Sequence, residues 1–181
     1  MTTVAFDGKT LVADSLSVVN GEATVSPKEK IHLPPYVGAW ELEGMVVLAL
    51  ACSGDAMAKR IMKKFLEQKL DTLHVSSIPT GTSSFSAIVI TEQKKAWKVV
   101  YRAKGPEGAG VQVIELGEKG SIGSGRAVAD GIMSIGLPAY DAVRGARNID
   151  PFTGGLLRSW SLDDPTVITK EIANSEVTNW G

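Results

Sequence analysis

The segment Met45–Ala51 reads MVVLALA, an unbroken apolar run that constrains the fold more than any other part of the sequence. A strand with one solvated face alternates polar and apolar residues, whereas a strand that is buried on both faces is apolar throughout. We therefore predict a buried strand here, in a sheet with other layers packed on both faces. The run is too short to cross a membrane as a helix, which needs roughly 18 to 20 apolar residues.

Strand-forming segments and turn signals surround this run. Asp7-Gly8 separates the β-rich segment Thr2–Phe6 from a predicted returning strand over Lys9–Val19, and Asn20-Gly21 repeats the signal. These dipeptides favour hairpin turns because Gly and Asn tolerate positive φ. Pro34-Pro35 ends a later strand. Further strands are predicted over Ala23–Val25, Lys30–Leu33, Phe85–Thr91, Ala96–Ala103, Val111–Leu116, Gly120–Gly123, Leu156–Ser161 and Val167–Lys170.

Three segments have the pattern of helices. The first opens at Ser53-Gly54-Asp55, with Ser53 or Asp55 as the N-cap, and its apolar face includes Phe65. The other two are predicted over Gly125–Ile135 and Ala139–Ile149, with Pro138 in the first turn of the latter. The order of strands, one helix, strands, two helices and strands favours an α+β fold with two sheets between helix layers. A chain of 181 residues suits a single domain over residues 1–181.

Composition excludes several classes of protein. The formal net charge is −1, which argues against a nucleic-acid partner, since such proteins usually carry a basic excess. Cys52 is the single cysteine and cannot form an internal disulfide, so we expect a buried structural thiol in a reducing, cytoplasmic setting. The N-terminus lacks the pattern of a signal peptide, and no membrane association is expected. His32 and His74 have no partner at ligand spacing, so no metal site is predicted.

Five motifs occur in a fixed order along most of the chain. Thr2–Ser15 is a threonine-headed strand, a tight turn and a second strand that ends in Asp14; Lys30 follows Asp14 by 16 residues (30 − 14). The other three motifs are Ala51–Ala56, Gly123-Ser124-Gly125 and the D-x-x-S/T-G-G segment Asp150–Gly155. In this order and spacing, the chain resembles the proteasome β-subunit superfamily, which includes HslV. Each motif is weak alone, but all five occur in order, and the resemblance runs from Thr2 to about Val167.

The resemblance implies an N-terminal nucleophile (Ntn) hydrolase with a four-layer αββα sandwich and a threonine-type peptidase activity. Thr2 would be the nucleophile once Met1 is removed, because the freed α-amine titrates near about 7.7–8.0 and can accept the hydroxyl proton. Lys30 would favour the alkoxide and lower the pKa of that amine, and Asp14 would hold Lys30 in place. The reaction would be amide hydrolysis through an acyl-enzyme ester.

The resemblance also assigns supporting roles. The backbone N–H of Ala51, where the family commonly has glycine, would stabilise the oxyanion. Ser124, Asp150 and Thr153 would gather near the Thr2 amine, orient it and help protons to move. No cofactor is required; a monovalent cation bound by backbone carbonyls near Asp150 and Thr153 is kept as an option.

The expected partners follow from the same family. Its members form homo-oligomeric rings, often stacked, around an internal chamber, so an unfolding ATPase and an unfolded protein or peptide substrate are expected. Two alternatives stay open: a non-catalytic assembly or scaffold subunit that retains Met1, and an Ntn amidase that acts on a small substrate. The stretch Leu33–Gly44, which includes Trp40 and looks longer than in the family, is interpreted as a hairpin, with a lid or a ring contact as alternatives.

Overall fold

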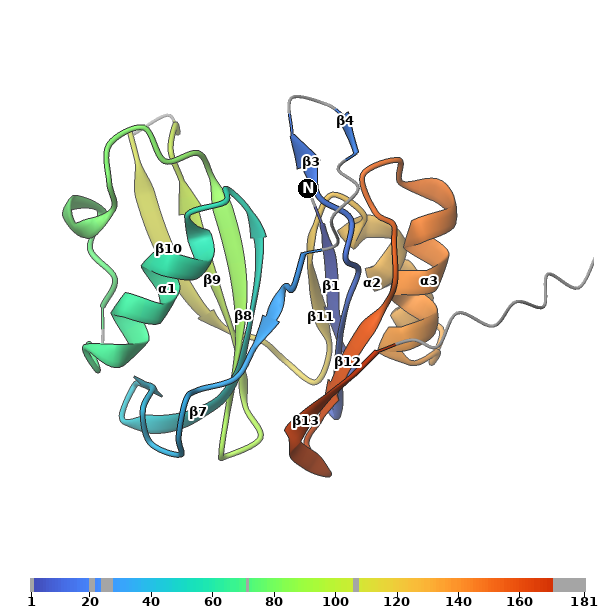
Figure 1. The fold of residues 1–181 in the computed structure, drawn as a ribbon, viewed down its shortest axis with the longest axis horizontal. Helices are drawn as coiled ribbons and strands as arrows, with labels where there is room; N and C mark the ends of the chain where they lie inside the picture. Colours follow the sequence, from blue (N-terminus) through green and yellow to red (C-terminus); the bar gives the residue numbers. More distant parts are fainter. Residues whose placement is uncertain (1, 20–21, 24–27, 71, 106–107, 171–181) are drawn as a thin grey trace, which may run out of the picture.

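A computed structural model describes residues 2–19, 22–23, 28–70, 72–105 and 108–170 of the chain (Figure 1). The second predicted turn, Asn20-Gly21, and the tail from Glu171 lie outside these residues. Two antiparallel sheets and three α-helices make up most of the described part, so the predicted α+β class is confirmed.

The first sheet is built around the N-terminal strand and has the order β11-β1-β2-β12-β13. Its strands are β1 (Thr3–Phe6), β2 (Thr10–Ala13), β11 (Gly120–Gly123), β12 (Arg158–Ser161) and β13 (Asp164–Lys170). The turn between β1 and β2 is the predicted one: Gly8 has a φ of 95°, and Asp7 Oδ1 accepts hydrogen bonds from the Lys9 and Thr10 amides.

The predicted strand Lys9–Val19 is wrong in its continuity, because residues 14–17 lie between two separate strands. β2 ends at Ala13, because the Asp14 side chain bonds the Leu16 amide and turns the backbone out of the ladder. The chain then forms a small separate ribbon of β3 (Val18–Val19) and β4 (Glu22–Ala23).

The second sheet has the order β10-β9-β8-β7-β5, and β6 pairs with the start of β7. Its strands are β5 (Ile31–His32), β6 (Glu41–Leu42), β7 (Met45–Gly54), β8 (Phe85–Thr91), β9 (Ala96–Arg102) and β10 (Gly110–Glu115). The β6–β7 hairpin turns at Glu43 and Gly44, which confirms a hairpin in the long stretch before β7. Trp40 within that stretch is fully buried, with the Lys63 ammonium 5.5 Å from its ring centroid.

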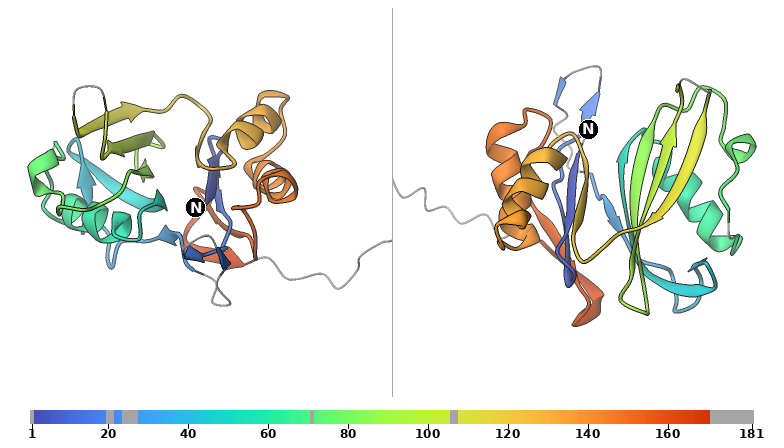
Figure 2. Two further views of the ribbon diagram at one scale, coloured as in Figure 1. Left: turned by 90° about the horizontal axis from the view of Figure 1, so that it is seen from above. Right: turned by 180° about the vertical axis from the view of Figure 1, so that it is seen from behind.

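The helices cover the outer faces of the two sheets. α1 (Ala58–Glu67) lies on the second sheet, and α2 (Arg126–Ser134) and α3 (Ala139–Ile149) lie on the first, while the two sheets face each other (Figures 1 and 2). A short 3-10 turn, η1 (Val75–Ser77), follows α1. Three apolar clusters fill the interfaces: one under α1, one between the sheets and one under α2 and α3.

The apolar run lies where the sequence predicts. Leu50 and Cys52 on β7 belong to the cluster under α1, whereas Ala49 and Ala51 belong to the cluster between the sheets. The prediction of a strand buried on both faces is therefore confirmed. The strand also continues to Gly54, so α1 begins later than predicted, at Ala58. Asp55 is not its N-cap but instead accepts a hydrogen bond of 2.7 Å from the Met57 amide in the connecting turn.

No helix in the described ranges is both long and apolar enough to span a membrane.

Gly123, at the end of β11, packs closely against the residue that precedes β1. Its φ is 103°, and a Cβ atom there would lie 1.6 Å from the Thr2 carbonyl oxygen. We predict that Gly123→Ala lowers the free energy of unfolding by at least about 1 kcal/mol, because left-handed strain alone costs about 1–3 kcal/mol.

The matched control is Gly131→Ala in α2, where an added Cβ meets nothing within 4 Å. This change should stabilise the chain by about 0.5–1 kcal/mol, since Ala is the better helix former. Urea unfolding of both variants decides the matter, and a Gly123→Ala protein as stable as the wild type contradicts the packing described here.

Candidate functional site

Strand pairing and one connecting turn bring three of the sequence motifs together at one end of the first sheet. β1 lies between β2, which is followed by Asp14, and β11, which is followed by Ser124. The turn over residues 150–155 joins α3 to β12 and contacts the same end, since the Ser15 and Leu16 amides both bond the Gly154 carbonyl. The start of β1 is therefore enclosed by segments that are far apart in the sequence.

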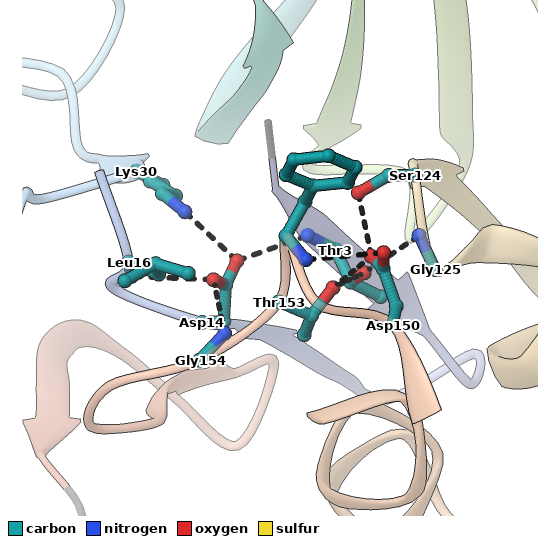
Figure 3. Close-up of polar contacts among 10 residues, drawn as sticks. Thr3, Asp14, Leu16, Lys30, Ser124, Gly125, Asp150, Thr153 and Gly154 are labelled. Atoms are coloured by element: carbon teal, nitrogen blue, oxygen red, sulfur yellow. Dashed lines mark hydrogen bonds and ion pairs between the residues drawn. The ribbon is translucent and has the colours of Figure 1, made fainter. Parts of the chain in front are cut away.

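The Asp14 carboxylate is the best connected group of this site and is almost completely buried. Its Oδ1 accepts hydrogen bonds from the Thr3 amide at 2.9 Å and from Lys30 Nζ at 2.8 Å. Its Oδ2 accepts hydrogen bonds from the backbone amides of Leu16 at 3.2 Å and Gly154 at 3.0 Å. Figure 3 shows that these donors approach the carboxylate from different segments.

Lys30 is buried with its partner: its side chain is 8% exposed and that of Asp14 is 0% exposed. The Lys30 carbonyl accepts a 3.2 Å hydrogen bond from the Cys52 amide, which fixes the lysine beside β7. Burial lowers the pKa of Lys30, and the attraction of the Asp14 carboxylate opposes that shift. The predicted ion pair between these two residues is thus present, and it is buried.

Asp150 forms a second polar group on the other side of β1. Its Oδ2 accepts hydrogen bonds from Ser124 Oγ at 2.6 Å and from Thr153 Oγ1 at 2.5 Å. Burial raises the pKa of the Asp150 carboxyl, but the hydrogen bonds from the two hydroxyls and from the Phe152 amide outweigh it, so the pKa lies below its ordinary value. Asp150 is therefore a carboxylate at neutral pH.

Thr3 connects the two polar groups. Its amide bonds Asp14, and its hydroxyl lies 2.5 Å from Thr153 Oγ1 and accepts a 3.1 Å hydrogen bond from the Gly125 amide (Figure 3). Gly125 has no room for a side chain, because an added Cβ would lie 2.4 Å from the Thr3 hydroxyl oxygen. Our sequence interpretation missed Thr3, although the Thr2-Thr3 doublet was a usable signal.

Thr2 lies directly before β1 and is 4% exposed. Its carbonyl accepts a 3.0 Å hydrogen bond from the Ser124 amide, and the peptide nitrogen that it shares with Thr3 is the donor to Asp14. The Thr2 backbone therefore lies between the Lys30–Asp14 pair and the Ser124–Asp150 pair. The approach of Lys30 to the Thr2 hydroxyl stays a prediction.

The structure does not place the amide of Ala51 at this site. Ala51 lies within β7, paired with Ile31 on one side and Ile88 on the other, and is fully buried. The neighbouring Cys52 amide bonds Lys30 on the β5 side, and amides alternate in direction along an antiparallel strand. The Ala51 amide consequently points to β8, inside the sheet.

The end of β7 reaches this site through Ser53. Gly123, whose α-carbon lies against the Thr2 carbonyl, has the Ser53 hydroxyl as another neighbour, 3.1 Å from where its Cβ would be. Ser53 was predicted only as a helix cap, so its place at the site was also missed. Its membership of the Ala51–Ala56 motif was the signal that could have found it.

The other titratable residues of interest lie elsewhere. Burial, together with the charges of Lys59 and Lys63, lowers the pKa of His32 to about 4, and burial raises the pKa of the Cys52 thiol to about 12. Cys52 is therefore an inert structural thiol, as predicted. Within the described ranges, no group of three or more His, Cys, Asp or Glu side chains is arranged to hold a metal ion. The monovalent cation near Asp150 and Thr153 stays a prediction.

No protein-family model and no curated protein matches the sequence. Solved structures do. BPH from Thiobacillus denitrificans, in complex with epoxomicin, matches with a TM-score of 0.59 and 20% identity over 88% of this chain and 97% of that chain. Anbu, an ancestral beta-subunit, from Yersinia bercovieri matches with a TM-score of 0.57 and 13% identity over 94% of this chain and 86% of that chain. At these identities the likeness shows a proteasome β-like fold.

We predict that Asp14→Ala lowers the free energy of unfolding by about 3–5 kcal/mol, because it leaves the buried Lys30 ammonium without its counter-charge. The control is Glu115→Ala, which removes the ion pair with Lys95, in which both side chains are nearly half exposed. That variant should lose at most about 1 kcal/mol. Urea unfolding compares the two, and equal losses would contradict the central place given to Asp14.

The depressed pKa of Asp150 predicts a particular pH dependence. A carboxyl with a folded-state pKa below its ordinary value of 3.8 stabilises the fold fully above that value, and the contribution is lost as pH falls through the folded-state pKa. The difference in unfolding free energy between wild type and Asp150→Asn should be constant from about pH 7 to about pH 4. It should shrink below that range, and a difference that grows in acid would show the opposite shift.

Proposed function

We propose that this chain is a threonine-type peptidase of the Ntn hydrolase class, which acts through Thr2 once Met1 has been removed. One observation carries the proposal: the Thr2 backbone lies between a buried lysine–aspartate pair and a hydroxyl–carboxylate pair. The arrangement of two facing sheets with helices on both outer sides supports the four-layer αββα sandwich of that class. The likeness to BPH and Anbu supports the same assignment at the level of the fold.

The chemistry begins with the Thr2 hydroxyl. Its Oγ1 attacks the carbonyl carbon of the scissile amide, and the α-amine of Thr2 accepts the hydroxyl proton. The tetrahedral intermediate then expels the leaving amine, which takes that proton, and an ester on Thr2 remains. Water then attacks the ester carbonyl while the α-amine of Thr2 accepts its proton. The C–O bond to Thr2 breaks, Oγ1 takes that proton back from the α-amine, and the carboxylic acid product leaves.

Lys30 supplies the positive charge for this step. An ammonium beside the hydroxyl favours the alkoxide over the neutral hydroxyl. The lysine can act only if it stays in one place, and the 2.8 Å bond to Asp14 provides that restraint in a buried setting. Asp14 is thus a positioning residue, because it contacts Lys30 and the Thr3 amide rather than the reacting atoms.

The oxyanion donor needs a new assignment, because the Ala51 amide points to β8. We assign it to the end of β7, where Ser53 and Gly54 lie near Gly123 and Ser124 at the open end of the strand. A preorganised donor at this point would stabilise the negative charge of the tetrahedral intermediate. Ser124, Asp150 and Thr153 would orient the α-amine, since their hydroxyls and carboxylate already form one hydrogen-bonded group.

We propose that this activity takes place in a homo-oligomeric ring in the cytoplasm, to which an unfolding ATPase delivers the substrate. Exposed apolar side chains on the α2–α3 layer support an assembly: Ile135 is 76% exposed and Ile149 is 70% exposed. Burial of these side chains against another subunit would remove them from water.

A non-catalytic assembly subunit is the second candidate. The observation that favours it is the burial of Thr2, which is only 4% exposed. In this reading, the hydrogen bonds of Thr3, Thr153 and Asp150 serve only to hold the sheet end together. An Ntn amidase on a small substrate would use the same residues and would differ only in its preference for acyl-amides over peptides.

Intact mass and peptide hydrolysis together test the proposal. The peptidase should lack Met1 and hydrolyse an unstructured peptide; Thr2→Ala should abolish turnover, and Thr2→Ser, which keeps a hydroxyl, should retain part of it. Lys30→Met should lower turnover by orders of magnitude in a protein that still folds. Full retention of Met1 in native, inactive protein would support the assembly subunit instead, and turnover that survives Thr2→Ala would refute the proposal.

A further inference from the structure

A cavity of about 390 Å³ lies next to the candidate site, where the space between the two sheets opens. The end of β7, the start of β8, the second half of β9 and the turn between β11 and α2 form its walls. Its polar lining includes Ser53, Ser86, Lys98, Arg102, Ser124 and Arg126. Neither the sequence motifs nor the proposed chemistry uses the three cationic residues of this set.

Strand alternation explains why this end of the inter-sheet space is charged. Ile88 and Ala96 point into the apolar cluster between the sheets. Lys98 lies directly opposite Ile88 in the ladder of β8 and β9, and Arg102 follows on the same side of β9. The face of the second sheet that looks toward the first is therefore apolar at one end and cationic at the other.

Asp130 attracts Lys98 from a distance, but no carboxylate in the described part of the chain forms an ion pair with the cations of the cavity. Among the described residues, Lys98, Arg102 and Arg126 take part in no ion pair. Burial lowers the pKa of Lys98, and the charge of Arg126 lowers it further against the attraction of Asp130. The ammonium of Lys98 makes one long hydrogen bond, 3.4 Å, to the Ser121 carbonyl.

The start of α2 adds to the positive potential. The helix begins at Arg126 with Gly125 as its N-cap, and its first turn contains no acidic residue. The N-terminus of a helix carries a partial positive charge, which favours anions close to it. The cavity thus combines two arginines, a half-buried lysine and a helix N-terminus, and this combination fits a carboxylate.

The cavity shares residues with the candidate site. Gly123 and Ser124 line it, and the same Gly123 lies against the Thr2 carbonyl while Ser124 bonds Asp150. A peptide whose scissile bond is at Thr2 would therefore bring a neighbouring part of its chain to the cations.

We propose that this cavity is a substrate subsite that selects a carboxylate of the peptide, either an acidic side chain or a free C-terminus. The inference rests on the proposed peptidase function and names its substrate class: peptides with an Asp or Glu residue, or a chain end, close to the cleaved bond. Lys98 and Arg126 would contact the carboxylate, and Arg102 would contribute long-range attraction from the rim.

Binding to the Thr2→Ala chain tests the subsite without any hydrolysis. One set of C-terminally amidated peptides carries a single Glu, placed at a different position relative to the scissile bond in each peptide. A matched set carries Gln at the same positions. At one position the Glu peptide should bind about tenfold tighter or more than its Gln partner, as expected for a charge-assisted contact. Repeating the series with a free C-terminus reveals whether the chain end supplies the carboxylate instead.

Substitution locates the preference in the cavity. Lys98→Met, which keeps length and removes charge, should reduce the Glu-over-Gln ratio toward one, and Lys98→Glu should make the chain prefer Lys over Glu at that position. The matched control is Lys95→Gln in the turn between β8 and β9, outside the cavity, which should leave the ratio unchanged. Thermal unfolding of each variant shows whether it is folded, and Arg126→Gln serves as the second variant if Lys98→Met does not fold.

The outcomes for this subsite and for the proposed function can be separated. Equal binding of every Glu and Gln peptide, together with no gain from a free C-terminus, overturns the subsite even if the wild type hydrolyses peptides. A Glu preference that Lys98→Met and Arg126→Gln leave intact also overturns it. A cavity-dependent preference in a chain that never hydrolyses peptides supports the subsite and refutes the peptidase.

Discussion

The buried carboxylate of Asp14 is the group on which the rest of the site depends. It accepts four hydrogen bonds, from the first strand, from Lys30, from the chain that leaves β2 and from the turn before β12. A carboxylate removed from water is costly unless its oxygens are satisfied, and here each oxygen has two donors. The same contacts that satisfy Asp14 also fix the position of Lys30 relative to the start of β1.

The second polar group completes the enclosure of β1. Asp150 holds the hydroxyls of Ser124 and Thr153, and Thr153 contacts Thr3, whose amide returns to Asp14. The network is therefore continuous from Lys30 to Ser124 through one residue of β1. It explains why glycine occupies the β11–α2 turn, since side chains at Gly123 or Gly125 would overlap Thr2 or Thr3.

Those parts of the structure that depend on patterns of neighbouring residues were predicted correctly from the sequence. The apolar run of β7, the Asp7-Gly8 turn and the pairing of Asp14 with Lys30 are all present, because alternation, turn chemistry and motif spacing are local or family-specific signals. The prediction that the Ala51 amide is the oxyanion donor was wrong. The direction in which a strand amide points depends on which strands pair with it, and the sequence does not show that pairing. The basic cavity was missed because Lys98 and Arg126 meet only after the two sheets have packed.

The central claim is that Thr2, held between these two groups, becomes covalently acylated. Rapid acid quenching of the Met1-free chain during turnover of a peptide, followed by intact mass and peptide mapping, tests this claim most directly. We expect a transient adduct with the mass of the acyl fragment on the N-terminal peptide, localised to Thr2 and absent in Thr2→Ala. An adduct on another residue, or turnover that needs no Thr2 adduct, would contradict the claim.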